Sequence, residues 1–436
     1  VAYEEGLRIP TLRLYERGER NAALLDTILG NVRMADEWLG DLEAKVAGCW
    51  RGEQELNTLL DRYDVRTLDE CCNYLIDASE RATRQAIGDI PDGSYAYRDV
   101  LEDDGLSDSH VALPLAVTIT VSADTMVVDF AGTAAQAPGA INLPFSMTQA
   151  AVYAVVKSLV GPEVLTNVGF EKPISVRAPT GTLVNPEFLA AVGGRAPLFF
   201  GLMDMMHRTL AQAVPERSPV PGEGGDVLHF TGSKPDGTPF ALLDLFFGGW
   251  GGRPNADGID GVAPMAFGSY GTVPAEIMER EFPVLVEGFG YVEDSAGAGR
   301  YRGSVAIYKQ WRFLASGKAM VRTNRLTRPS GGLQGGGPGA LSRNIRNPNS
   351  VNEAVLTNRA HIHLDLEEGD VLYHEIAGSG GHGDPLTRDP ERVVQDVLDE
   401  KVSAQAAAET YGVVLHANAL TVDEAATLAL RATRAG

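Results

Sequence analysis

The first residues that could carry chemistry lie in a basic stretch with a run of glycines inside it. Residues 295–352 hold ten Lys and Arg and no Asp or Glu, in a chain with a formal net charge of −21. The stretch includes Arg325 and Arg328, followed by a glycine-rich loop that contains Gly331, Gly332, Gly335, Gly336 and Gly337. Glycines let main-chain N–H groups approach an anion, and Arg supplies fixed charged donors. The pattern predicts a phosphate or carboxylate site. The alternative is a basic strand face that pairs with acidic neighbours or with a partner subunit.

Two further glycine-rich segments carry polar side chains. Residues 248–261 follow an apolar run and contain Arg253, Asp257 and Asp260, which could bind a metal or a polar substrate. The alternative is a tight surface turn with solvated carboxylates. Residues 378–390 contain His382 and Asp384, which are too close in sequence to define a catalytic dyad by themselves. Without other information, this third segment is a flexible linker into the last helices.

The remaining histidines give weaker signals. His361, His363 and Asp365 alternate along an expected strand, so they share one face and could bind a metal. More often such a stripe is the hydrated side of a sheet. His207 lies among methionines on an apolar helix, where packing is the favoured interpretation over a ligand role. The sequence contains no serine nucleophile elbow and no Thr or Ser after a Gly-Lys pair, which argues against a phosphate-binding P-loop.

The elements that must position these residues follow from periodicity. Helical spacing predicts helices within residues 21–87, at 147–159 and at 198–214, and alternation predicts a hairpin over 115–130. Short strands separated by glycine-rich turns are expected over 226–377, and the tail is helical from Pro390, with Ser403 as a helix N-cap. The fold class is therefore α+β and multidomain. We expect a helical segment (1–105), a mixed α/β domain (106–217), a β-rich domain with glycine-rich loops (218–385) and a helical tail (386–436).

Composition excludes several classes of protein. The acidic balance argues against a nucleic-acid binder, because phosphate backbones attract basic surfaces. The longest uncharged run, residues 130–156, is interrupted by proline and amide side chains, which excludes a membrane span there. Three cysteines, Cys49, Cys71 and Cys72, cannot form a disulfide framework, so a reducing, cytoplasmic location is expected. The chain begins at Val1 without Met, and we expect it to be a processed fragment or one half of a split protein.

Several segments together resemble the hydantoinase B/oxoprolinase family. The most specific is Gly-Ser-Gly-Gly-His-Gly-Asp-Pro-Leu-Thr-Arg-Asp-Pro at 378–390. Others agree in their order along the chain: Asp-Phe-Ala-Gly-Thr at 129–133, the glycine-rich segments at 248–261 and 331–339, and Gly-Ala-Gly at 297–299. The resemblance covers nearly the whole chain.

The resemblance implies a two-component amidase. An actin-fold ATPase partner, similar to hydantoinase A, would use ATP to phosphorylate the amide oxygen of a cyclic substrate, and a B-type subunit would help to hydrolyse the activated ring. His382 and Asp384 are then the expected catalytic residues. The arginines, glycines and carboxylates of the other two glycine-rich segments would bind the substrate and its phosphate.

The family is usually longer at its N-terminus, where a His-His-x-Asp type motif holds a divalent metal. This sequence has no counterpart, so the metal is expected in a missing N-terminal part or in a separate polypeptide of a hetero-oligomer. Two alternatives stay open: a subunit of an ATP-dependent ketone carboxylase, and a non-catalytic scaffold that docks the ATPase subunit.

Overall fold

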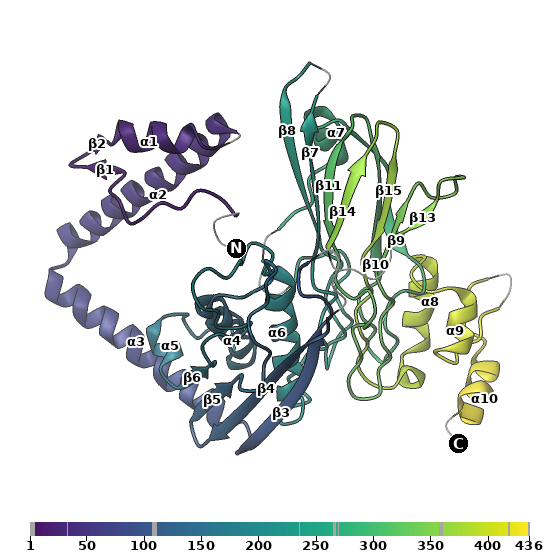
Figure 1. Cartoon of the computed structure of the whole chain (residues 1–436). Coiled ribbons are helices and arrows are strands. Elements are labelled where there is room, and N and C mark those ends of the chain that lie inside the picture. Colours follow the sequence, from purple (N-terminus) through teal and green to yellow (C-terminus); the bar gives the residue numbers. More distant parts are fainter. Residues whose placement is uncertain are drawn as a thin grey trace.

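A helical arm projects from one side of the molecule (Figure 1). The structure, a computed structural model, describes residues 5–32, 34–106, 111–234, 236–264, 267–268, 270–356, 361–416 and 419–434. The arm comprises β1 (Tyr15–Glu16), β2 (Glu19–Arg20), α1 (Ala22–Leu29), α2 (Ala35–Arg62) and α3 (Val65–Gly88). The Asp64 carboxylate caps α3 by accepting from the Thr67 amide at 2.7 Å. None of the 28 residues of α2 is buried, whereas the last turns of α3 bury Ser79, Thr83 and Ile87 against the body.

The arm leads into a mixed α/β unit. Its sheet has the order β3-β4-β5-β6, formed by β3 (Gly93–Leu101), β4 (Leu113–Ser122), β5 (Thr125–Asp129) and β6 (Ile174–Arg177). The helices α4 (Phe145–Val160), α5 (Val168–Glu171) and α6 (Ala196–Leu210) accompany it. The β4–β5 hairpin and helices α4 and α6 confirm the sequence predictions. Strand β3 corrects one of them, because it falls in the segment expected to be helical yet pairs with β4 along its whole length.

The β-rich part is a sandwich of two antiparallel sheets. One sheet has the order β14-β11-β7-β8 and the other β13-β12-β15-β10-β9. The strands are β7 (Asp226–Ser233), β8 (Pro239–Phe246), β9 (Val284–Val292), β10 (Ala306–Phe313), β11 (Gly317–Arg322), β12 (Arg343–Arg346), β13 (Ala354–Val355), β14 (His361–Leu366) and β15 (Val371–Glu375), and helix α7 (Ala275–Glu281) precedes β9. Aromatic side chains of both sheets, such as Phe230, Phe246 and Trp311, fill the space between them.

The tail is helical and has its own small core. The 3-10 helix η2 (Pro385–Thr387) leads into α8 (Pro390–Leu398), α9 (Ala404–Glu409) and α10 (Glu424–Arg434). Ser403 caps α9 as predicted, since its hydroxyl accepts from the Ala406 amide at 3.0 Å. Val393, Val402 and Val413 form the centre of this core. Helices, a mixed sheet and a sandwich in one chain confirm the α+β class, while the domain boundaries at 105, 217 and 385 stay predictions.

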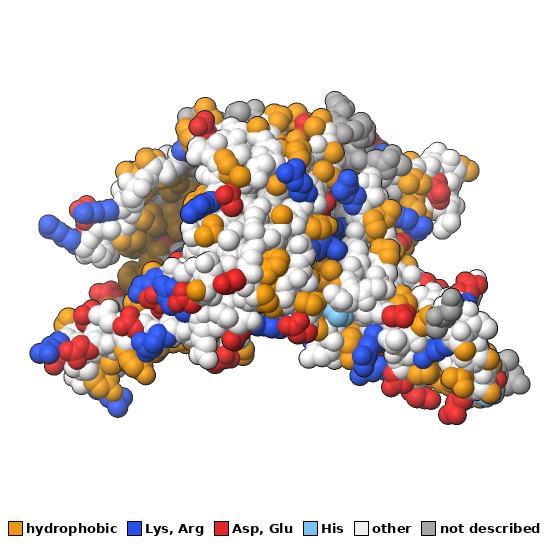
Figure 2. Space-filling view, turned by 90° about the horizontal axis from the view of Figure 1, so that it is seen from below, with side chains coloured by type: hydrophobic (Ala, Val, Ile, Leu, Met, Phe, Trp, Pro, Cys, Tyr) orange, Lys and Arg blue, Asp and Glu red, His pale blue; other side chains and the backbone are white. Residues whose placement is uncertain are grey.

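Seen from below, the arm and the tail project to opposite sides of a central body, and charged side chains gather on both projections (Figure 2). No helix within the described part of the chain is both long and apolar enough to span a bilayer.

Candidate functional site

A cleft lies between helix α6 and the loops that flank the sandwich. It consists of two adjoining cavities that share Phe200, Asp204 and Gly224. The polar cavity is lined by the side chains of Asp99, Glu102, Asp204, Glu223, Asn324, Arg325 and Arg328, among others. The second cavity is mostly apolar and is lined by Met203, His207, Val220, Trp250 and Pro264, among others. We call the whole the α6 cleft. Arg325 and Arg328, predicted from the sequence as anion-binding residues, both lie in it.

In the structure both arginines are paired with carboxylates. Arg325 contacts Asp204 of α6 in a partly buried ion pair. Arg328 Nη1 lies 3.2 Å from Asp99 Oδ1, and its side chain is 54% exposed. The same holds for most of the basic stretch: seven of its ten cations lie within 4 Å of a carboxylate, namely Arg302, Lys309, Arg312, Arg325, Arg328, Arg343 and Arg346. Pairing with acidic neighbours, the alternative interpretation of this stretch, therefore describes much of it.

The acidic residues of the α6 cleft are strongly perturbed. Burial raises the pKa of Asp204 to about 6, even though Arg325 and Arg208 oppose the shift. Glu223 is 1% exposed, and burial together with the nearby Asp226 raises its pKa well above the usual range. Its Oε1 accepts from the Gly248 amide at 2.7 Å. The α6 cleft thus holds a buried carboxyl group with a raised pKa beside an ion pair, a combination typical of functional sites.

His207 is a residue that sequence reasoning assigned to packing. It lies three residues after Asp204 on α6, so both face the same side of the helix. The residue is 4% exposed, and neither Nδ1 nor Nε2 has a hydrogen-bond partner among the described residues. Burial lowers its pKa to about 4, so the imidazole is neutral at pH 7. The spacing of Asp204, His207 and Arg208 on one helix was the only sequence signal that could have identified it.

The glycine-rich segments pack closely against one another beside the α6 cleft, and we call this group of main-chain contacts the glycine cluster. Segments 248–261, 297–303, 331–339 and 378–383 approach so closely that a Cβ on Gly303 would lie 1.9 Å from the Ser379 carbonyl oxygen. The amides of Gly336 and Gly337 donate to the carbonyls of Leu333 and Ala298 at 2.9 and 2.7 Å. These two amides therefore already donate hydrogen bonds within the glycine cluster, and an anion at this loop would have to bind through Gly331, Gly332 and Gly335.

His382 and Asp384 are not brought together. His382 is 8% exposed, and its Nε2 lies buried with no hydrogen-bond partner among the described residues. Asp384 is exposed, and its Oδ1 accepts from the Leu386 amide at 2.8 Å, which caps the turn of η2. No hydrogen bond joins the two side chains, both of which the structure describes. Their catalytic role stays a prediction that this geometry does not favour.

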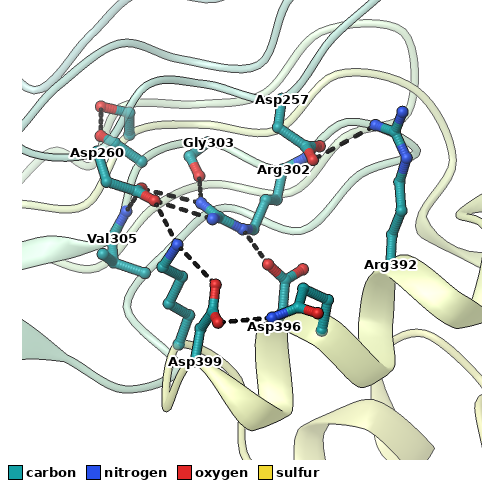
Figure 3. Close-up of polar contacts among 12 residues, drawn as sticks. Asp257, Asp260, Arg302, Gly303, Val305, Arg392, Asp396 and Asp399 are labelled. Atoms are coloured by element: carbon teal, nitrogen blue, oxygen red, sulfur yellow. Dashed lines mark hydrogen bonds and ion pairs between the residues drawn. The ribbon is translucent and has the colours of Figure 1, made fainter.

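Asp257 and Asp260 lie in a buried ion network that fastens the tail to the body (Figure 3). Asp260 accepts two hydrogen bonds of 2.9 Å from the Arg302 guanidinium, whose Nε lies 2.8 Å from Asp396 of α8. Burial opposes ionisation of Asp260, but the hydrogen bonds and charge of Arg302 outweigh it and hold its pKa below the usual value. Arg253 donates to the Asp257 carbonyl through Nε and Nη2 at 2.9 and 2.7 Å. The contacts of these three predicted site residues hold the fold together, away from the α6 cleft.

No group of three His, Cys, Asp or Glu side chains within the described residues could hold a metal ion. His361 and His363 do lie on β14 as expected, with His361 buried and 4.0 Å from Asp103, while His363 is exposed. The residues that the structure describes therefore do not fit a resident divalent metal.

Comparison with known proteins gives a consistent result. A family model described as hydantoinase B/oxoprolinase matches residues 1–385. The chain is 28% identical to a Pseudomonas sp. (strain NS671) protein named as the putative B subunit of a D-/L-hydantoinase, over 95% of this chain and 71% of that protein. It is 29% identical to the beta subunit of the caprolactamase of Pseudomonas jessenii, over 99% of this chain and 75% of that relative.

Two solved structures share the fold. The crystal structure of the ATP-dependent caprolactamase from Pseudomonas jessenii superposes with a TM-score of 0.85 at 27% identity, and covers 99% of this chain and 75% of that one. A nucleotide-free acetone carboxylase chain superposes with a TM-score of 0.86 at 18% identity, and covers 100% of this chain and 64% of that one. At this identity, the second likeness concerns the fold alone.

Proposed function

The chain belongs to the hydantoinase B/oxoprolinase family, and from this premise we propose that it is a subunit of an ATP-dependent enzyme complex that opens cyclic amides. The observation that carries the proposal is the similarity to a caprolactamase subunit along 99% of the chain, with agreement in fold at a TM-score of 0.85. In this proposal a hydantoinase A-like ATPase of actin fold phosphorylates the amide oxygen. The chain described here then binds the activated ring for attack by water.

In this proposed complex, the α6 cleft binds the activated substrate. Phosphorylation makes the amide carbon a better electrophile and adds negative charge, which Arg325 and Arg328 can receive. The Arg328–Asp99 pair is partly exposed, with 54% of the Arg328 side chain and 29% of the Asp99 side chain accessible, so exchanging Asp99 for a phosphate oxygen costs little. The imidazole of His207 is neutral at pH 7 and adds no charge, and burial favours the uncharged form of the Glu223 carboxyl group, which lowers its repulsion of the anion.

The divalent metal expected for the family has no place among these residues, since the described side chains do not fit a metal site. The roles given to the arginines do not depend on it. If the complex uses a metal, its ligands must come from another chain or from a part of the protein outside the described residues.

A ketone carboxylase subunit is the second candidate function. The chain is 26% identical, over 99% of its length and 69% of the relative, to the acetophenone carboxylase delta subunit of Aromatoleum aromaticum. Both reactions pass through a phosphorylated oxygen, so the arginines of the α6 cleft would serve either. A dependence of turnover on bicarbonate distinguishes them.

The test is to reconstitute the chain with a hydantoinase A-like ATPase and to measure ring opening and ADP release with lactams and hydantoins, with and without bicarbonate. We expect ring opening that needs ATP and no bicarbonate. Arg325→Ala combined with Arg328→Ala should lower ATP-coupled turnover at least about 100-fold, as expected for the loss of charged donors to a developing anion. Lys318→Ala, an exposed cation of the same basic stretch, is the matched control and should retain activity. Full activity of the double variant would contradict the assignment.

A further inference from the structure

The apolar half of the α6 cleft contains a buried polar group with nothing to bind. His207 is only 4% exposed, and both ring nitrogens lack hydrogen-bond partners in the part of the chain that the structure describes. Leaving a buried donor and acceptor unpaired costs about 1–3 kcal/mol per group, so such groups usually have a partner in the functional state. A ligand in this cavity would supply that partner.

The walls around His207 fit a small hydrocarbon ring. Phe200, Met203 and Val220 present carbon and sulfur, and Trp250 adds its indole. The indole Nε1 already donates to the Ala263 carbonyl at 2.8 Å, so Trp250 offers only its apolar surface to the cavity. Such walls favour methylene groups and give no partner to a second polar group.

The charged pair between the two cavities favours a neutral ligand. Asp204 stands where the two cavities meet and is paired with Arg325. Because this pair has no net charge, it offers neither a cation nor an anion in the apolar cavity a free counter-charge. The neutral imidazole can donate one hydrogen bond and accept another. An amide, with one donor and one acceptor and no net charge, complements it.

We propose that the cavity at His207 binds the unreacted cyclic amide, with its methylene groups against Phe200, Met203 and Trp250 and its amide group hydrogen-bonded to the imidazole. The inference rests on the proposed function for the class of substrate, and it goes beyond it by assigning the pocket and a specificity-determining residue. His207 is then a binding residue that recognises the ring before Arg325 and Arg328 receive the phosphorylated form.

The test uses ε-caprolactam as the probe and the chain alone, without ATP. Binding is followed by calorimetry and by the imidazole ¹⁵N resonances of the chain's eight histidines, with His207 assigned through its variant. We expect the His207 resonance to shift on titration. His207→Phe, which keeps an aromatic ring and removes both nitrogens, should weaken binding at least about tenfold. His363→Phe makes the same substitution on the exposed face of β14 and should bind like the unaltered chain.

A lactam that binds His207→Phe as tightly as the unaltered chain, or that leaves the His207 resonance unmoved, overturns the proposal. His207→Gln provides a second variant, and a second route to the assignment, should the phenylalanine disturb folding. If neither variant folds, a titration that moves none of the histidine resonances of the unaltered chain overturns the proposal. The two proposals fail separately. Lactam binding at His207 without ring opening by the reconstituted complex would refute the proposed function only, and ring opening with no response at His207 would refute this pocket only.

Discussion

At the scale of single residues, Asp204 and His207 should give opposite pH dependences to stability. The folded Asp204 keeps its proton up to about pH 6, whereas the unfolded residue loses it near 3.8. Between these values the native state binds more protons, so the free energy of unfolding falls as pH rises. The folded His207 stays neutral down to about pH 4, while the unfolded residue takes up a proton below 6.5. Its contribution to stability therefore rises with pH over the same interval.

Urea unfolding of variants between pH 4 and 6 measures both effects. Asp204→Asn should make the free energy of unfolding rise more steeply with pH, and His207→Phe should make it rise less steeply. Each change should approach about 1.4 kcal/mol per pH unit, the value of one proton. Arg325 and Arg208 also face Asp204 and reduce the upward shift of its pKa, whereas the nearby Asp99 adds to it. Slopes that stay the same in both variants would show that neither group titrates as its burial implies.

At this scale, the sequence predicted the basic residues of the α6 cleft but not its acidic residues. The missing acidic residues between 295 and 352 singled out Arg325 and Arg328, and both lie in the α6 cleft. Asp204 and Glu223 come from other elements and carry no local motif, so only the folded chain could place them there. His207 was interpreted as a packing residue because its neighbours in sequence are methionines. Burial is correct, but sequence alone could not show that both ring nitrogens lack a partner.

At the scale of elements, the glycine cluster should not tolerate a side chain at its most closely packed positions. Gly303→Ala would place a methyl group 1.9 Å from the Ser379 carbonyl oxygen. This oxygen belongs to the main chain, so it cannot move aside as the end of a flexible side chain could. We expect a loss of about 1–3 kcal/mol or more in the free energy of unfolding, as for other overpacked interiors. Gly52→Ala on α2 is the matched control, because nothing lies within 4 Å of its Cβ position. Replacing a glycine inside a helix should stabilise the chain by up to about 1 kcal/mol. If Gly303→Ala and Gly52→Ala change the free energy of unfolding equally, close packing in the glycine cluster does not limit the residue at position 303.

Elements with a clear period were predictable, and those without one were not. The alternation over 115–130 predicted the β4–β5 hairpin, and Ser403 predicted the start of α9. Strand β3 was missed because it lies within the segment 1–105, which was expected to be helical, and because its partner β4 begins twelve residues after β3 ends. The glycine-rich segments have no period at all. Their contacts join residues up to 130 positions apart, and only the folded main chain shows why glycine is needed there.

At the scale of the whole molecule, the helical tail depends on a buried arginine. Arg388 is 1% exposed in its side chain, and its Nη1 and Nη2 lie 2.5 and 3.0 Å from the Asp257 carboxylate. Nη2 also lies 2.7 Å from Asp396 of α8, so one guanidinium joins a glycine-rich loop of the body to the tail. Two parts of the chain that lie 131 residues apart thus share a single charge cluster.

Removing this guanidinium should loosen the tail before the rest of the molecule. Arg388→Met leaves the buried carboxylate of Asp396 and the partly buried carboxylate of Asp257 with less compensation, and breaking a buried pair in this way costs about 3–5 kcal/mol. Arg392→Met is the matched control, because Arg392 is 51% exposed and lies 3.5 Å from Asp257, where an ion pair contributes at most about 1 kcal/mol. Denaturant unfolding measures the loss, and limited proteolysis followed by mass spectrometry should place the first new cleavages of Arg388→Met after residue 385. Asp257→Asn added to Arg388→Met should recover part of the stability, since it removes one of the charges left without a partner. If Arg388→Met and Arg392→Met lose the same small amount, the tail is held by its apolar contacts and the ion network contributes little to its attachment.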